Sequence, residues 1–174
     1  RQTNLGSLST DAMLWQAHRV AGAFGVDSAR IAIQNGGGIR NNGVVPAGDI
    51  SMATVFDIHP FGNLLSILPR TKATTLKDAL ENAVRLLPAP SGAFAQIAGA
   101  RMWIDTTRPG AKIDASGAIV QRGSRVRTLV LGDADTLVRD GEVVDSSRRV
   151  VVATLNFLAL GGDAYPFKGD SVVH

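Results

Sequence analysis

Two stretches of this chain repeat apolar residues at intervals of three and four, and this spacing constrains the fold more than any other feature. The first stretch covers residues 5–24 and predicts a helix with one buried face. The second follows Thr74 or Thr75, either of which would cap the helix, and ends before the Pro-rich segment 88–92. The expected buried faces are Leu5, Leu8, Ala12, Met13, Ala17, Val20 and Phe24 in the first helix, and Leu76, Ala79, Leu80, Ala83, Val84 and Leu87 in the second.

Most of the remaining chain has the pattern of strands and turns. A short helix is predicted to begin at Ser51, with a loop over residues 57–60. Asp140-Gly141 is a strong hairpin signal. Strands are predicted at residues 30–33, 64–68, 100–105, 125–131, 136–139, 142–144 and 149–155. No linker or repeat divides the sequence, so we expect one α+β domain over residues 1–174, with a mixed β-sheet flanked by helices.

The composition excludes several classes of protein. Cysteine is absent, which rules out disulfides, thiolate metal sites and a cysteine nucleophile. The net charge is only +3 and the 18 Lys and Arg residues are scattered, so we expect no nucleic-acid partner. No apolar run approaches the roughly 18 residues that indicate a membrane span. The chain opens without Met, and we therefore expect a processed or excised piece.

Residues that could perform chemistry are scarce. The histidines, His18, His59 and His174, lie far apart in the sequence, and no His, Asp or Glu group has the spacing of metal ligands. No Ser lies in a nucleophile elbow. The run Gly36-Gly37-Gly38-Ile39-Arg40 lacks the Gly-Lys-Ser/Thr ending of a Walker loop. We therefore expect no catalytic residue, no metal and no other cofactor within this chain.

Polar and aromatic residues on predicted loops are better candidates, because binding residues are often on loops. Residues 35–40 offer glycine N–H groups, an amide and a fixed positive charge, which suit hydroxyls and phosphate oxygens. Phe61 lies in a Pro-Phe-Gly segment, and Phe157 precedes paired glycines and Asp163. Each feature also has a plainer explanation: a tight turn with a solvated Arg, two rings packed in the core, and a carboxylate that caps a turn.

The order of these segments resembles the signature of a known family, the C-terminal domain of the 5'-nucleotidases. The matching segments are Asn35-Gly36-Gly37-Gly38-Ile39-Arg40, Pro60-Phe61-Gly62-Asn63 and Asn156-Phe157-Leu158-Ala159-Leu160-Gly161-Gly162-Asp163. Residues 4–13 resemble the family's first helix in this domain, and Leu80-Glu81-Asn82 lies on a helix where the family has one. The resemblance therefore spans nearly the whole chain. Two departures from the pattern, Leu160 and Ala164-Tyr165, adjoin Asp163 and concern base preference more than fold.

The resemblance implies a division of work between two domains. Family members, which include ecto-5'-nucleotidases, UDP-sugar hydrolases and NAD nucleotidases, hydrolyse nucleotides with an N-terminal metallophosphoesterase domain that holds two divalent metal ions. That domain is absent from this chain and would be its partner in the same polypeptide. The C-terminal domain would bind the nucleotide or nucleoside, and the isolated chain is expected to be inactive. The family also implies a periplasmic, secreted or cell-surface location.

The resemblance assigns the substrate-binding roles residue by residue. Phe61 and Phe157 would hold the base between two rings, and Asp163 would hydrogen-bond to the base or the sugar. A base stacked on an aromatic ring gains roughly 1–3 kcal/mol with little dependence on its identity. The complete set of expected contacts is Asn35, Gly38, Arg40, Phe61, Phe157, Asp163 and Arg1, in which Asn35 and Arg40 contact the ribose and phosphate and Arg1 is a further phosphate contact.

Three alternatives remain open at this stage. The chain could be a free-standing nucleoside- or nucleotide-binding module with no catalytic partner domain. It could be a structural domain with a degenerate site, in which case replacing Phe61 would cost stability rather than affinity. If the chain is part of an enzyme, a 2',3'-cyclic nucleotide phosphodiesterase or a UDP-sugar hydrolase would share the same segments.

Overall fold

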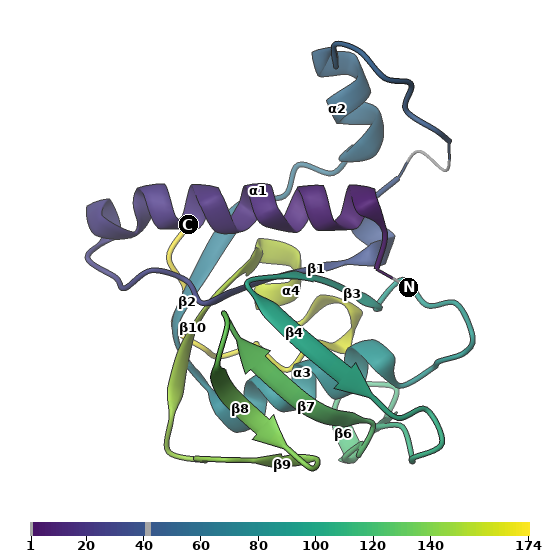
Figure 1. The fold of residues 1–174 in the computed structure, drawn as a ribbon, viewed down its shortest axis with the longest axis vertical. Coiled ribbons are helices and arrows are strands. Elements are labelled where there is room, and N and C mark those ends of the chain that lie inside the picture. The colour runs from purple at the N-terminus through teal and green to yellow at the C-terminus, as the bar shows by residue number, and fades with distance from the viewer. Residues whose placement is uncertain (1, 41–42) are drawn as a thin grey trace.

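We describe the fold from a computed structural model, which covers residues 2–40 and 43–174. The helices are α1 (Asn4–Ala21), α2 (Met52–Ile58), α3 (Ala73–Val84) and α4 (Asn156–Ala159), with 3₁₀ turns η1 (Gly22–Phe24), η2 (Gly36–Gly38) and η3 (Gly162–Ala164). The strands are β1 (Ile31–Asn35), β2 (Leu65–Lys72), β3 (Ala95–Ala98), β4 (Ala100–Ile104), β5 (Lys112–Ile113), β6 (Ile119–Gln121), β7 (Val126–Leu131), β8 (Asp135–Arg139), β9 (Glu142–Val143) and β10 (Arg149–Leu155). These elements form a mixed α and β domain, as predicted (Figure 1).

The main sheet has the strand order β2-β10-β1-β3 and is mixed. β1 is parallel to β10, whereas β2 and β3 are antiparallel to their neighbours. The carboxyl ends of β1 and β10 and the amino end of β2 therefore meet at one edge of the sheet. This edge brings together the loops that follow β1 and β10 and the loop that precedes β2.

The sequence predicted one sheet, and the structure contains several. A second, antiparallel sheet has the order β4-β7-β8-β9, and β5 pairs with β6. The chain passes from β3 in the first sheet to β4 in the second at Gly99, where φ is +76°. A Cβ on Gly99 would lie 2.5 Å from the carbonyl oxygen of Arg30, so glycine is needed at this close approach.

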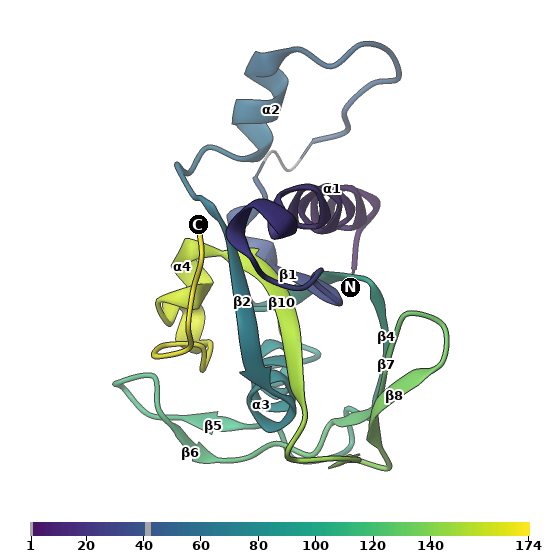
Figure 2. The ribbon, with the colours of Figure 1, turned by 90° about the vertical axis from the view of Figure 1, so that its left-hand side faces the viewer.

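The largest cluster of buried side chains lies between the two sheets, where α3 packs (Figure 2). The predicted apolar face of α3 is confirmed: Leu76 and Leu80 are fully buried, and only Leu87 lies partly exposed beyond the end of the helix. The predicted cap is wrong. The cap residue is Lys72, without a side-chain hydrogen bond, because β2 runs directly into α3 and leaves no loop for a capping Thr.

The bounds predicted for α1 and η1 are confirmed, but the predicted buried face is only partly right: Ala17 is buried, and Met13 and Val20 pack against the core. The buried residues of α1 are small or polar: Gly6, Ser9, Thr10, Ala17 and Ala21. Leu8 and Phe24, both expected in the core, are exposed. The reason is a close approach to β3, since a Cβ on Gly6 would lie 1.9 Å from the side-chain oxygen of Gln96. Helices that pack this closely do so through small side chains.

Several smaller differences follow from local context. β3 was not predicted, because all four of its residues are buried and it lacks the alternation that marks a half-exposed strand. α2 extends to Ile58, into the segment predicted as a loop, and projects from the rest of the domain (Figure 1). The hairpin at Asp140-Gly141 is confirmed between β8 and β9, with positive φ at both residues.

Candidate functional site

The three loops that resemble the family signature lie at the shared edge of the main sheet. Asn35 ends β1, and Asn156 follows β10. The side-chain oxygen of Asn156 accepts a hydrogen bond from Leu64 N at 2.9 Å, and Asn156 N donates to Leu64 O at 3.0 Å. These bonds join the loop after β10 to the loop before β2. The strand order therefore gathers residues that are far apart in the sequence.

Asn35 and Asp163 are in direct contact at this edge. The amide nitrogen of Asn35 donates to a carboxylate oxygen of Asp163 at 2.7 Å. Asn35 is only 4% exposed, and its side-chain oxygen is buried without a hydrogen-bond partner among the described residues. A hydrogen bond to a carboxylate is stronger than one between neutral groups, so Asn35 fixes the orientation of the Asp163 carboxylate. Asp163 is exposed, so its carboxylate is accessible to a ligand.

The backbone around Asp163 is held by residues that the sequence did not single out for the site. Asn82, on α3, donates from its side chain to Asp163 O at 2.9 Å. Asp163 and Ala164 both have positive φ, at 52° and 60°. The buried hydroxyl of Tyr165 donates to Ala93 O at 2.8 Å. Burial, and to a smaller extent the charge of Asp163, raises the pKa of Tyr165 above its ordinary value, so this hydroxyl keeps its proton.

Phe157 lies on α4 and is half-exposed, which leaves part of its ring accessible to a ligand. One side of the ring packs on Gly162. A Cβ added to Gly162 would lie 2.5 Å from the ring carbon Cζ of Phe157. The paired glycines of this loop therefore have a physical role, because a side chain at position 162 would displace the ring.

Phe61 lies in the loop before β2 and is also half-exposed. The guanidinium carbon of Arg40 lies 5.4 Å from the centre of the Phe61 ring, within the range of a cation–π interaction. The backbone N–H of Arg40 donates to Ile58 O at 2.8 Å, which ties the segment after η2 to the end of α2. Among the described residues, the aromatic pair in contact is Tyr165 and Phe167, so Phe61 and Phe157 do not stack on each other.

The glycines of η2 serve the fold more than was expected from the sequence. Gly36 N donates to Phe94 O at 2.7 Å, and Gly37 N donates to Gly92 O at 2.8 Å, so neither N–H is available to a ligand. Gly38 lies against Asn35, because a Cβ at this position would be 2.9 Å from the Asn35 side-chain oxygen. Gly38 therefore lets the chain turn tightly over Asn35.

Two cavities adjoin this edge, and each is lined by some of the expected residues. One, of about 890 Å³, is lined by Arg40 and Gly37 together with residues around Pro88 and the start of α1. The other, of about 330 Å³, is lined by Gly38 and Phe61 together with residues from α1, β1, β2 and β10. Asn35, Phe157 and Asp163 line neither cavity. The structure thus brings Asn35 to Asp163 and Arg40 to Phe61, as two separate pairs.

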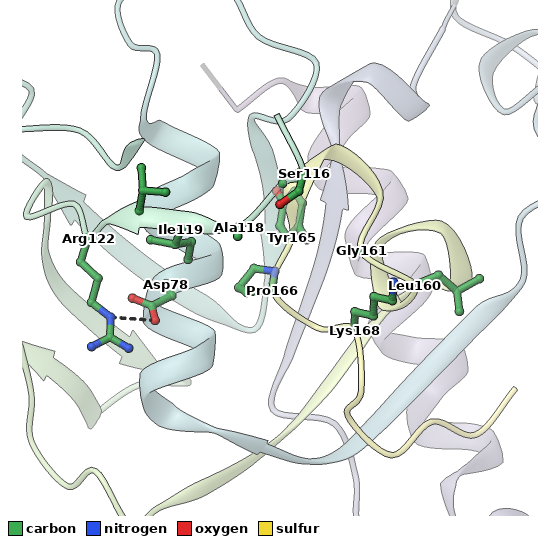
Figure 3. Close-up of a pocket in the computed structure, with 12 residues that line it drawn as sticks. Asp78, Ser116, Ala118, Ile119, Arg122, Leu160, Gly161, Tyr165, Pro166 and Lys168 are labelled. Carbon is green, nitrogen blue, oxygen red and sulfur yellow. Dashed lines mark hydrogen bonds and ion pairs between the residues drawn. The ribbon is translucent and has the colours of Figure 1, made fainter. Parts of the chain in front are cut away.

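A third cavity, of about 690 Å³, is lined by none of the expected residues, although Leu160, Gly161 and Tyr165, which flank Asp163, line it (Figure 3). It is formed by the β5–β6 hairpin, α3 and the segment that includes Leu160 and Lys168. Arg122 and Asp78 form an ion pair at its side, with 3.1 Å between Nε and the carboxylate oxygen. Burial raises the pKa of Asp78, and Arg122 opposes that shift.

The remaining expectations concern metals, membranes and Arg1. Within residues 2–40 and 43–174, no three His, Cys, Asp or Glu side chains gather as metal ligands. Among the helices described, none has the length and apolar character needed to cross a membrane. Arg1, expected as a phosphate contact, lies outside the described residues.

Comparison with known proteins places this fold among the C-terminal domains of 5'-nucleotidases. The 5'-nucleotidase precursor from Thermus thermophilus has the same fold, with a TM-score of 0.76 and 33% identity; the match covers 99% of this chain and 30% of that one. A family model described as the 5'-nucleotidase C-terminal domain matches residues 1–169. The chain belongs to this family.

The curated relatives are longer proteins. The trifunctional nucleotide phosphoesterase protein YfkN of Bacillus subtilis is 32% identical over 166 residues, which cover 95% of this chain and 10% of that protein. Protein UshA of Escherichia coli is 31% identical over 165 residues, which cover 95% of this chain and 23% of that protein. This chain therefore spans less than a quarter of the length of these two relatives.

Proposed function

We propose that this chain is the nucleotide- and nucleoside-recognition domain of a 5'-nucleotidase-type phosphohydrolase, and that it hydrolyses nothing by itself. The observation that carries the proposal is the gathering of three loops at one sheet edge. These loops hold two half-exposed phenylalanines, Phe61 and Phe157, a carboxylate fixed by Asn35, and the cation of Arg40 beside Phe61. This combination suits a flat heterocycle joined to a polyhydroxylated sugar and an anionic phosphate.

Each part of the proposed site matches one part of a nucleotide. The faces of Phe61 and Phe157 would stack on the base, at roughly 1–3 kcal/mol for each stacked contact. Asp163, oriented by Asn35, would accept hydrogen bonds from the base or from ribose hydroxyls. Arg40 would contact the phosphate, since a guanidinium can donate two parallel hydrogen bonds to phosphate oxygens. Asn35 and Gly38 would shape the wall beside the ribose.

In this proposal the chemistry belongs to a second domain of the same polypeptide. A metallophosphoesterase domain with two divalent metal ions would polarise the phosphoryl group and activate water. The present chain would hold the nucleoside so that the phosphate reaches those ions, which is a positioning role. The named relatives include a 5'-nucleotidase and a trifunctional phosphoesterase, so we propose the nucleotide class rather than one nucleotide. A periplasmic, secreted or cell-surface location is part of the same proposal.

Calorimetric titration of the chain with adenosine and AMP tests the recognition role. We expect saturable binding by the wild-type chain, and at least about fivefold weaker binding by both Phe61→Ala and Phe157→Ala, since each removes one stacked contact. Trp103→Ala is a matched control, because Trp103 is an aromatic residue of similar exposure on β4, in the second sheet. Its replacement should leave the affinity unchanged.

Two results would count against the proposal. Wild-type affinity that survives both phenylalanine replacements would exclude the aromatic site. Metal-dependent release of phosphate from AMP by the pure chain would show that catalysis resides here after all. Release of phosphate only when the chain is joined to the preceding domain is the expected result.

A further inference from the structure

His59 lies two residues before Phe61 and joins three elements through hydrogen bonds. Its backbone N–H donates to Val55 O at 2.8 Å and ends α2. Its ring atom Nε2 lies 3.0 Å from the hydroxyl oxygen of Ser9 on α1. Its other ring nitrogen, Nδ1, lies 3.5 Å from the side-chain nitrogen of Gln34 on β1. No role in nucleotide recognition follows from the family resemblance for this residue.

The directions of these hydrogen bonds define the protonation state of the ring. The Ser9 hydroxyl donates its single hydrogen to Leu5 O at 2.8 Å, so it can only accept from His59. The partners on both sides of the ring therefore favour the tautomer with its proton on Nε2. Nδ1 is then an acceptor, and it receives the N–H of Gln34 across a longer distance. Every donor in this series points the same way, from Gln34 through His59 and Ser9 to Leu5.

Among the described residues that line the cavity beside His59, none carries a charge that would favour a second proton. The ring faces a cavity of about 330 Å³, whose other lining residues are uncharged on α1, β1, β2 and β10 alike. The charged residue nearest to it along the chain, Asp57, is exposed, and so is Arg40, whose backbone N–H donates to Ile58 O. Burial lowers the pKa of His59 below its ordinary 6.5.

Protonation would break the series of hydrogen bonds. A proton on Nδ1 would place two donors face to face, because the Gln34 nitrogen already points there. Gln34 has little room to turn, since it is 2% exposed. The short loop from His59 to Phe61 would then lose its contact with β1, and the Phe61 ring would lose its fixed orientation.

We propose that His59, neutral and with its proton on Nε2, is the positioning residue that sets the ring of Phe61 for nucleoside binding, and that protonation of His59 releases that ring. This inference rests on the proposed function for its effect on affinity. The sign follows from the direction of the shift: because the pKa of His59 is lowered, the ring is mainly neutral at pH 6.5 and above, and the contact is lost as the pH falls through that lowered pKa.

The test uses fluorine and nitrogen NMR on the 174-residue chain, with 4-fluorophenylalanine at position 61. The imidazole nitrogen shifts should show the Nε2–H tautomer at pH 8. The fluorine resonance should move or broaden between pH 7 and pH 5 in step with protonation of His59. Adenosine affinity should fall at least about fivefold over the same range, as expected for the loss of one stacked contact. Adenosine is used in place of AMP because a phosphate monoester itself titrates near pH 6.

Two variants give the controls. His59→Gln places an amide nitrogen near the position of Nε2, can still donate to Ser9 and does not titrate. It should keep the fluorine resonance and the affinity independent of pH. His18→Gln removes a different histidine, whose Nε2 contacts Ala29 O at 2.7 Å on the far part of α1, and should keep the wild-type pH profile.

The outcomes separate this inference from the proposed function. An Nδ1–H tautomer, a fluorine signal that does not respond to pH, or a wild-type pH profile in folded His59→Gln would each overturn the role of His59. The first two measurements use the wild-type side chain and need no variant to fold. Absence of adenosine binding at pH 8 would instead remove the nucleoside site, while the fluorine and nitrogen signals would still decide whether His59 sets Phe61.

Discussion

The loops that carry Phe157 and Phe61 differ in what holds them. Phe157 packs on Gly162, beside a backbone fixed by Asn82 and by the buried Tyr165. Phe61 adjoins Gly62, where a Cβ would meet no atom within 4 Å. We infer that one ring is fixed by close packing and the other by hydrogen bonds through His59. The first loop should therefore respond to changes of volume, and the second to changes of protonation.

The largest expected effect tests the loop of Phe157, which is held by close packing. Tyr165→Ala removes a ring that is 2% exposed and packs on Phe167 with 5.8 Å between ring centres. We expect the free energy of unfolding to fall by about 3–5 kcal/mol, the usual cost of truncating a large core aromatic residue. Urea unfolding followed by circular dichroism measures it.

Phe61→Ala is the matched control for that loss. Because the Phe61 ring is 48% exposed, its removal should cost less than about 1 kcal/mol of stability. Comparable losses of stability in Tyr165→Ala and Phe61→Ala would contradict the proposed difference between the two loops. A large loss at Phe61 without any change in nucleoside affinity would favour the structural-domain alternative.

A pair of glycine substitutions tests the same difference between the two loops, with an intermediate expected change in stability. Gly162→Ala should destabilise the chain by about 1–3 kcal/mol and displace the Phe157 ring, because the new methyl group overlaps it. Gly62→Ala should change stability by no more than about 1 kcal/mol, since the position is open and its backbone φ is not positive. Thermal unfolding of both variants is the measurement. Equal losses of stability would refute the inference that close packing on Gly162 fixes the Phe157 ring.

The smallest expected effect concerns backbone strain beside Asp163. Ala164 has a φ of +60°, which costs an L-residue about 1 kcal/mol and costs glycine almost nothing. Ala164→Gly should therefore raise the stability by up to about 1 kcal/mol, against the usual direction of an Ala-to-Gly exchange. Ala12→Gly, an exposed position inside α1, should lower it by a similar amount. Destabilisation by both exchanges would mean that the strain is absent.

Much of the fold was predictable because its signals are local. Spacing and turn chemistry within a few residues predict α3, the hairpin at Asp140-Gly141 and β10. The buried face of α1 was not predictable in the same way. Its sequence offers Leu8 and Phe24 for burial, but only the distance to β3 decides that Gly6 and Ser9 face the sheet.

The candidate site also has features that the local sequence predicts and features that only tertiary packing sets. The sequence by itself determined the family and the segments that contain the proposed contacts, because each segment is a continuous run with its own turn-forming glycines. Only the tertiary structure decided that Asn35 donates to Asp163, that Asn82 holds the same loop, and that Ser9 orients His59. These partners are 50 to 128 residues apart in the sequence. The parallel pairing of β1 with β10 brings Asn35 to the Asp163 loop, and the packing of α1 and α3 supplies Ser9 and Asn82.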